Sequence, residues 1–248
     1  MSKTNEPTNF RKIINRIAYG HDTRKVFDGF VRLSACALAA QTREPEYLEE
    51  AKRWKPDELS LFAQALSTLT MEMERRPFED LLGAYYMEFA LSTKGQQWNG
   101  EFHTPKALCD LMAKMTMPDG LPPGDDKVTV CEPACGAGAM ILALAESVAP
   151  QRRRLRVTAI DINKTACDMT FINTTLWGIP TKVIHGNTIS QEFWSQWFNF
   201  HWLCPWLQPM GNNPDATPDV AAQVIPLLIE QGVPPSPEEV EQLSLALA

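Results

Sequence analysis

The sequence predicts an α/β fold in which a partial parallel sheet follows an N-terminal helical region. Up to residue 98, apolar side chains recur at steps of three and four, which is the spacing of one helix face. Beyond that point, short β-type runs alternate with helical segments, the pattern of β-α-β units with parallel strands. We therefore expect a helical region at 1–98, an α/β domain at 99–207 and a proline-rich C-terminal segment with short helices at 208–248.

Three helices are expected in the N-terminal region. Residues 24–41 carry apolar side chains at helical spacing. A second helix begins at Pro56, where a proline followed by two acidic residues makes a favourable first turn, and it ends before Pro77. The third covers residues 78–91. We interpret their apolar faces as core packing, and nothing in them indicates catalysis.

The α/β domain is expected to begin with a short helix at 106–115, followed by four strands. Helical segments separate the first three of these strands, so we expect them to be parallel. The expected strands cover residues 128–133, 156–162, 182–187 and 198–205.

Composition and charge indicate an ordinary globular chain. Hydrophobic residues make up 44% of it, and the net charge is −7, which disfavours a protein that coats nucleic acid. The basic run at 151–156, QRRRLR, is interpreted as a solvated loop between a helix and a strand.

Cysteine and histidine usage predicts neither disulfides nor a metal site. The six cysteines form no CxxC pair, and no Cys/His cluster has zinc spacing. The N-terminus lacks the apolar core of a signal peptide, and no apolar run approaches a membrane-spanning length. These features predict a protein of the reducing cytoplasm, without a membrane or a metal as partner.

The most informative stretch is VTVCEPACGAGAM, where a strand ends at Glu132 and the chain turns through Gly136 and Gly138 into a helix. Glycines at such a turn let the backbone pass close to a ligand. The stretch matches neither the G-x-G-x-x-G dinucleotide fingerprint nor a phosphate-binding loop with its lysine. An acid before the turn instead suits a cationic group, such as the ammonium of an amino acid.

Two further strand ends complete the candidate ligand site. Asp161 ends the second strand, where a carboxylate can accept hydrogen bonds from a ribose diol. Asn187 ends the third, and its amide suits the edge of an adenine. Ammonium, ribose and adenine together describe S-adenosylmethionine. The alternative is that these residues are merely the strand-end turns of another α/β protein.

Three segments resemble the DNA adenine methyltransferases, in particular the modification subunit of type I restriction systems: GEFHTPKALCDLM, CEPACGAGAM and FEDLLGAYYMEFALSTKGQQWNGEF. The resemblance covers roughly residues 77–207. It implies a Rossmann-like S-adenosylmethionine-dependent methyltransferase domain, with DNA and restriction-modification subunits as partners. The residues that it implies for cofactor binding are Phe102, Thr104, Pro105, Glu132, Gly136, Gly138, Asp161 and Asn187.

The catalytic element of this family follows the fourth strand and reads Asn/Asp-Pro-Pro-Tyr/Phe. Aligned with it, FNFHWLCPWL places Cys204 on the catalytic Asn/Asp, Pro205 on the first proline, Trp206 on the second and Leu207 on the aromatic residue. Adenine's amino group is a poor nucleophile, so it needs a side chain that accepts its hydrogens. A thiol is a weak acceptor, and leucine cannot stack on a base as an aromatic ring does. The substitutions therefore predict impaired catalysis.

Two readings of function remain open from the sequence. In the first, the chain is an active DNA adenine methyltransferase with an unusual motif. In the second, it is a catalytically silent protein, a pseudoenzyme that binds S-adenosylmethionine, DNA or a restriction subunit. The residues at 208–248 are too few for the strands that follow the catalytic strand in this family, which favours the second reading. A third reading is methyl transfer to RNA, protein or a small molecule.

Overall fold

The computed structural model describes residues 9–39, 42–89 and 104–204. All of them belong to one compact unit, Met1–Leu207, while the second unit, Gln208–Ala248, lies outside the described residues. The boundary that we expect at residue 98 also falls outside them and stays a prediction.

The N-terminal part is helical, as predicted, and contains two short helices that the sequence did not indicate, α1 and α3. Asn9 and Asp22 cap α1 and α2, because their side chains accept hydrogen bonds from the backbone amides of Lys12 and Lys25. Pro56 begins α4, as expected. The helices are α1 (Phe10–Ile17), η1 (Ala18–Gly20), α2 (Thr23–Leu38), α3 (Glu44–Ala51), α4 (Pro56–Arg75) and α5 (Leu81–Phe89).

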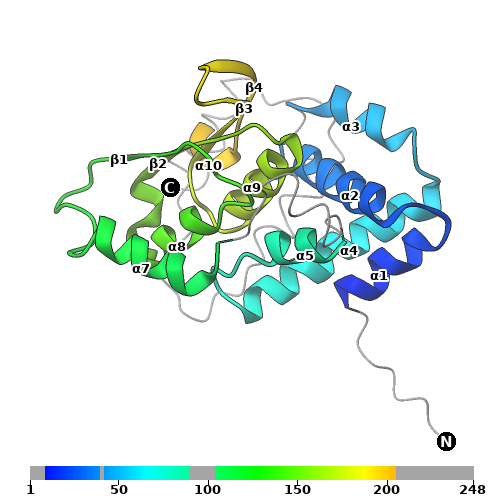
Figure 1. Cartoon of the computed structure of the whole chain (residues 1–248), viewed down its shortest axis with the longest axis horizontal. Helices are drawn as coiled ribbons and strands as arrows, with labels where there is room; N and C mark the ends of the chain where they lie inside the picture. Colours follow the sequence, from blue (N-terminus) through cyan, green and yellow to red (C-terminus); the bar gives the residue numbers. More distant parts are fainter. Residues whose placement is uncertain (1–8, 40–41, 90–103, 205–248) are drawn as a thin grey trace, which may run out of the picture. The chain divides into compact units, whose positions relative to one another are not determined.

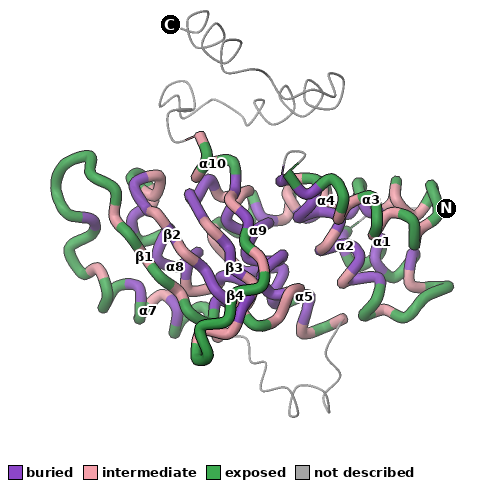
Figure 2. The backbone as a smooth tube through the Cα atoms, turned by 90° about the horizontal axis from the view of Figure 1, so that it is seen from above, coloured by how far each residue is buried: buried purple, intermediate pink, exposed green. Residues whose placement is uncertain are grey.

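The first three strands are parallel, as predicted, and lie in the order β1-β2-β3. Helix α9 packs against β2 and β3 and also against α2 and α5, so it separates the sheet from the N-terminal helices (Figure 1). Buried residues follow β2, β3 and α9 (Figure 2). The elements are α7 (Lys106–Thr116), β1 (Val128–Glu132), α8 (Ala139–Ser147), η2 (Ala149–Arg154), β2 (Leu155–Asp161), α9 (Lys164–Leu176) and β3 (Thr181–Asn187).

The basic run at 151–156 is not a solvated loop, contrary to our interpretation. It forms most of the 3₁₀ helix η2 and the start of β2. Arg154 is buried, and its guanidinium donates to the backbone carbonyls of Asp126 (3.0 Å) and Pro122 (2.8 Å). Arg154 thus holds the loop that precedes β1, because a buried guanidinium needs acceptors for its donors.

The fourth strand was wrongly placed by the sequence. The observed β4 is Glu192–Phe198, and it runs antiparallel to β3. A four-residue connection between β3 and β4 suits a hairpin and is far too short for a parallel crossover. Residues Phe200–Leu203, expected in the strand, form the helical turn α10 instead. Asn199 ends the strand at Phe198, because its Oδ1 caps α10 by accepting from the amide of Trp202. The same Oδ1 accepts from the amide of Thr181 (3.1 Å), and Nδ2 donates to the carbonyl of Ile179 (2.7 Å).

A group of charges around a buried ion pair joins the helical region to α9. Asp168 on α9 pairs with Arg43 (2.8 Å), Arg32 (3.0 Å) and Lys164 (3.8 Å). The side chains of Asp168 and Arg43 are each 1% exposed. Glu46 on α3 accepts from the same three cations and is only partly buried. We call these five side chains the ionic cluster.

The ionic cluster predicts an acid-sensitive step in stability. Burial alone would raise the pKa of Glu46, but Arg43 and Lys164 lower it to about 2. A carboxylate with a depressed pKa stabilises the fold above its unfolded pKa and loses that contribution as the pH falls toward the folded value. We therefore expect the free energy of unfolding to fall between about pH 4.5 and about pH 2. Denaturant titrations should show a weaker decline for Glu46→Gln, whereas Glu49→Gln, at an exposed carboxylate, should follow the wild type.

No helix in the described part of the chain combines the length and apolar character needed to cross a membrane. Within residues 9–39, 42–89 and 104–204, no three His, Cys, Asp or Glu side chains are grouped so that they could hold a metal ion.

Candidate functional site

Three of the predicted ligand residues end neighbouring parallel strands. Glu132 ends β1, Asp161 ends β2 and Asn187 ends β3. Glu132 lies beside Ala159, and Asp161 lies beside His185. Because the strands are parallel, all three side chains come to the carboxyl edge of the sheet, where open α/β sheets bind ligands.

The turn between β1 and α8, residues 133–138, requires its glycines. Gly136 has φ +53° and Gly138 has φ +91°, a region that L side chains rarely adopt. A Cβ on Gly138 would also lie 3.2 Å from the hydroxyl of Thr170. A Cβ on Gly136 would meet nothing within 4 Å, so the backbone there faces open space that a ligand can occupy. We call residues 133–138 the glycine turn.

Asp161 braces the glycine turn. Its Oδ2 accepts a hydrogen bond from the amide of Gly136 (2.8 Å), and its Oδ1 accepts from the amide of Asn163 (2.8 Å). A carboxylate has about four acceptor sites, so these two bonds leave capacity for a ligand hydroxyl. The structure thus gives Asp161 a role that the sequence did not predict, while its binding of a ribose stays a prediction.

Glu132 lies in an environment that disfavours its charge. Burial raises its pKa, and the nearby charge of Asp161 adds to this effect, although the amide of Ala134 donates to Glu132 Oε1 (3.3 Å). Two carboxylates near each other are each stabilised by a cation. The pair therefore suits a positively charged ligand group.

Asn187 shapes the loop after β3. Its Oδ1 accepts hydrogen bonds from the amides of Ile189 (2.9 Å) and Ser190 (3.2 Å), which makes an Asx turn. The neighbouring Thr188 donates from its hydroxyl to the carbonyl of Pro133 (2.7 Å), tying this loop to the glycine turn. Since the side-chain oxygen of Asn187 already accepts two hydrogen bonds within the turn, its side-chain nitrogen is the group suited to donate to a ligand.

The structure adds Ile162 to the candidate site. This residue directly follows Asp161 and is 60% exposed, although it is apolar. Its carbonyl is 3.2 Å from Nε2 of His185, whose ring lies 4.7 Å from that of Trp194. An exposed aliphatic side chain beside a strand-end carboxylate can pack on the flat face of a base. The signal for it was the strand-end sequence AIDI, in which an apolar residue follows the acid.

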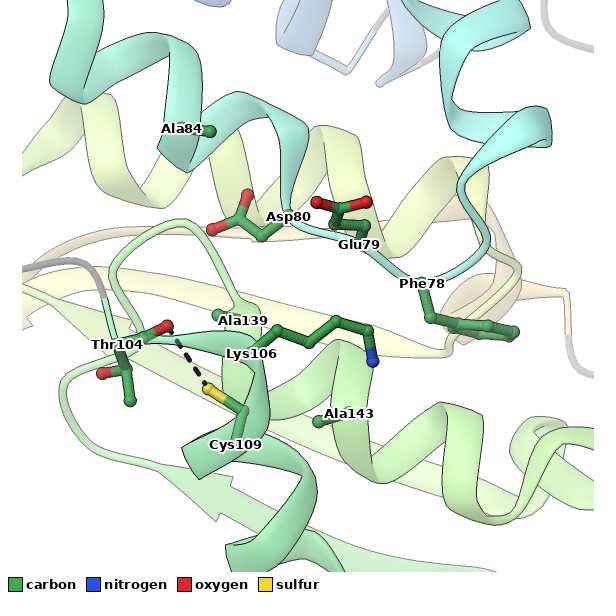
Figure 3. Close-up of a pocket in the computed structure, with 9 residues that line it drawn as sticks. All are labelled: Phe78, Glu79, Asp80, Ala84, Thr104, Lys106, Cys109, Ala139 and Ala143. Atoms are coloured by element: carbon green, nitrogen blue, oxygen red, sulfur yellow. Dashed lines mark hydrogen bonds between the residues drawn. The ribbon is translucent and has the colours of Figure 1, made fainter.

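A cavity of about 120 Å³ lies close to the glycine turn, between α7, α8 and the segment before α5 (Figure 3). Thr104 and Ala139, the first residue of α8, line it, together with Phe78, Glu79, Asp80, Ala84, Lys106, Cys109 and Ala143. Ligand pockets commonly measure about 300–1,000 Å³, so this cavity is too small for a whole nucleoside ligand. None of Glu132, Gly136, Gly138, Asp161 and Asn187 lines it.

Residues 104–106 are positioned at the start of α7. Pro105 is the N-cap of this helix, and the carbonyl of Thr104 lies 3.7 Å from Sγ of Cys109. Lys106 pairs with Asp110 (2.9 Å) and with Glu146 on α8 (2.7 Å), which holds α7 against α8. Phe102 lies outside the described residues.

Cys204 is not brought together with the glycine turn. Phe198 at the end of β4 pairs with Lys182 at the start of β3, so the chain leaves the sheet at its amino edge, opposite to Glu132 and Asp161. Cys204 follows α10 there. Burial raises its pKa, so the thiol stays protonated at neutral pH. Pro205, Trp206 and Leu207 lie outside the described residues.

One comparison with known proteins, a match to a family model, covers the segments singled out above. A family model described as N-6 DNA Methylase matches residues 78–207. Among solved structures, the chain is similar to the type I restriction-modification system methyltransferase subunit from Streptococcus thermophilus, with 15% identity and a TM-score of 0.38. The match covers 73% of this chain and 40% of that chain. No curated protein matches.

Proposed function

Since the chain belongs to the N-6 DNA methylase family, we propose that it is a DNA adenine methyltransferase-like protein that binds S-adenosylmethionine. The observation that carries this proposal is the meeting of Glu132, Asp161 and Asn187 around the glycine turn at one edge of the sheet. The open space at Gly136 and the raised pKa of Glu132 fit a ligand that approaches the backbone closely and carries positive charge.

Each residue of the site then has a role in holding the cofactor. Glu132 binds the ammonium group, Asp161 accepts from a ribose hydroxyl, and Asn187 donates to the adenine, whose face packs on Ile162. Thr104 and Pro105 directly precede α7, and with Phe102 they stay proposed cofactor residues. The bound cofactor supplies an electrophilic methyl group, and the protein's task is to fix its position.

The electrostatics of Glu132 predict a pH dependence of cofactor affinity. A proton on Glu132 competes with the cofactor's ammonium group, and the pKa of this carboxyl is raised by its burial. Affinity should therefore rise with pH until Glu132 is ionised, with a midpoint above the ordinary pKa of a glutamate carboxyl. Calorimetric titrations across mildly acidic pH should show this rise. Glu132→Gln should bind more weakly and lack the rise; an equal pH dependence in that variant would exclude Glu132 as the cause.

We propose that the isolated chain does not transfer the methyl group to DNA by itself. The residue aligned with the catalytic Asn/Asp, Cys204, follows α10 at the opposite edge of the sheet. A thiol is also a weak acceptor for adenine's amino hydrogens. Labelled cofactor incubated with the purified chain and mixed-sequence DNA should give no incorporation above background, and robust methylation would refute this proposal.

The position of Cys204 also predicts the result of repairing the motif. Cys204→Asn should restore no methyl transfer, because the new amide would lie at the amino edge, away from Gly136. Its melting temperature and cofactor affinity should match those of the wild type. A gain of methyl transfer in this variant would show that residue 204 reaches the cofactor.

The second candidate function is regulatory, and the same placement of Cys204 favours it. A chain that keeps a cofactor site without a catalytic group beside it suits a binding partner of DNA or of restriction-modification subunits. The measurement that separates the two functions is methyl transfer with added modification and specificity subunits. Transfer that appears only with them indicates a completed enzyme, whereas binding without transfer indicates a regulator.

A further inference from the structure

We infer that Asn173 is a positioning residue that holds the glycine turn in its ligand-ready shape, and that Asp80 supports it from the helical region. The inference deepens the proposed function, and its cofactor readout rests on that function. Nothing in the motif segments pointed to Asn173, which lies inside α9 and is 0% exposed.

The contact between Asn173 and the glycine turn is direct. Nδ2 of Asn173 donates to the carbonyl of Ala137 (2.8 Å) and to Oδ1 of Asp80 (3.0 Å). Both partners are acceptors, so the orientation of the amide is set by its two donor hydrogens. A buried backbone carbonyl without a partner is costly, so the loss of this amide would strain the turn.

Asp80 extends the contact into the helical region. Its Oδ1 also accepts from the amide of Gly83 (2.8 Å) in the first turn of α5. Asp80 is 7% exposed, and a hydrogen bond to a buried carboxylate is stronger than one between neutral groups. The start of α5, the last turn of α9 and the glycine turn therefore form one hydrogen-bonded unit, although Asp80 and Asn173 lie 93 residues apart.

Thr170 makes the matching contact one helical turn earlier. Its hydroxyl donates to the carbonyl of Gly136 (2.8 Å), and residues three apart share a helix face. Two consecutive carbonyls of the glycine turn thus point at α9. In a trans peptide, C=O and N–H point in opposite directions, so the amide of Ala137 points away from Thr170. Holding the carbonyl of Gly136 directs that donor away from α9. Holding the carbonyl of Ala137 fixes the next peptide, whose Gly138 amide donates to the carbonyl of Cys135 (2.8 Å) and closes the turn.

The first test compares Asn173→Ala with Thr174→Ala. Thr174 is the next residue of α9 and is also 0% exposed, but its hydroxyl bonds the carbonyls of Thr170 and Phe171 in its own helix. We expect Asn173→Ala to weaken the binding of S-adenosylmethionine by about tenfold or more, the equivalent of one such hydrogen bond. Thr174→Ala should change it less than about twofold. Equal affinities in the two variants, measured by calorimetry, would overturn the inference.

The second test uses Asp80, in case Asn173→Ala does not fold. Asp80→Asn keeps the Oδ1 acceptor for Asn173 and Gly83, whereas Asp80→Ala removes it. We expect Asp80→Asn to bind the cofactor nearly as the wild type does and Asp80→Ala to lose affinity as Asn173→Ala does. The same loss in both Asp80 variants would contradict the acceptor role.

A third measurement needs no cofactor and separates this inference from the proposed function. Hydrogen exchange of the amides in residues 133–138 should be faster in Asn173→Ala and Asp80→Ala than in Thr174→Ala and Asp80→Asn. If the wild type does not bind S-adenosylmethionine, the proposed function fails, and the exchange rates still decide whether Asn173 holds the turn. Unchanged exchange in Asn173→Ala would overturn the inference.

Discussion

We expect Asp168→Ala to lower the free energy of unfolding by about 3–5 kcal/mol, the usual cost of breaking a buried ion pair. Asp168 is the buried one of the two carboxylates that Arg32, Arg43 and Lys164 share, and its removal leaves these cations only the partly exposed Glu46 as a partner. Arg43 is 1% exposed and cannot move its charge into water without unpacking α3. Equilibrium denaturation monitored by circular dichroism measures the change.

Glu49→Ala is the control for Asp168→Ala. Glu49 pairs with Lys52, but both side chains are about 70% exposed, so this pair contributes less than about 1 kcal/mol. A loss of the same small size in Asp168→Ala would mean that the ionic cluster does not fasten the helical region to α9.

We expect Gly136→Asp to weaken the binding of S-adenosylmethionine by roughly a hundredfold or more, equivalent to about 3 kcal/mol. The new side chain would enter the open space beside Gly136 and place a third carboxylate near Glu132 and Asp161. Aspartate tolerates a φ near +53° better than most residues, so the fold should survive the change. Titration calorimetry and a melting curve of the same sample separate binding from stability.

Gly120→Asp is the matched control for Gly136→Asp. Gly120 also has a positive φ, +75°, and a Cβ there would meet nothing within 4 Å, but it lies in the loop before β1. The two variants should lose similar stability, and only Gly136→Asp should lose the cofactor. An equal loss of binding in both would trace the effect to unfolding.

The sequence was sufficient for the parts of the fold that depend on local pattern. The strands β1 to β3 and the polar residues at their ends were predicted from the sequence, because short β-type runs that alternate with helical segments are a local pattern. The aromatic run at 198–205 misled because a short apolar run fits a strand and a helical turn equally well. The capping role of Asn199 decides between them, and it depends on Thr181 and Ile179 in three dimensions.

The parts of the site that could not be predicted depend on contacts between distant residues. Asn173 and Thr170 look like ordinary polar residues of a helix, and only the fold brings them to the carbonyls of the glycine turn. Asp168 forms an ion pair with Arg43, which lies 125 residues away in the sequence. A polar side chain that is buried needs a hydrogen-bond or charge partner, and the periodicity of the sequence does not show which distant residue provides it.

Calorimetric titration of the wild-type chain measures whether S-adenosylmethionine binds at the glycine turn. We expect saturable binding with one site per chain, weakened by roughly a hundredfold or more in Gly136→Asp and retained in Gly120→Asp. Absence of binding in the wild type, or equal binding in Gly136→Asp, would contradict this expectation.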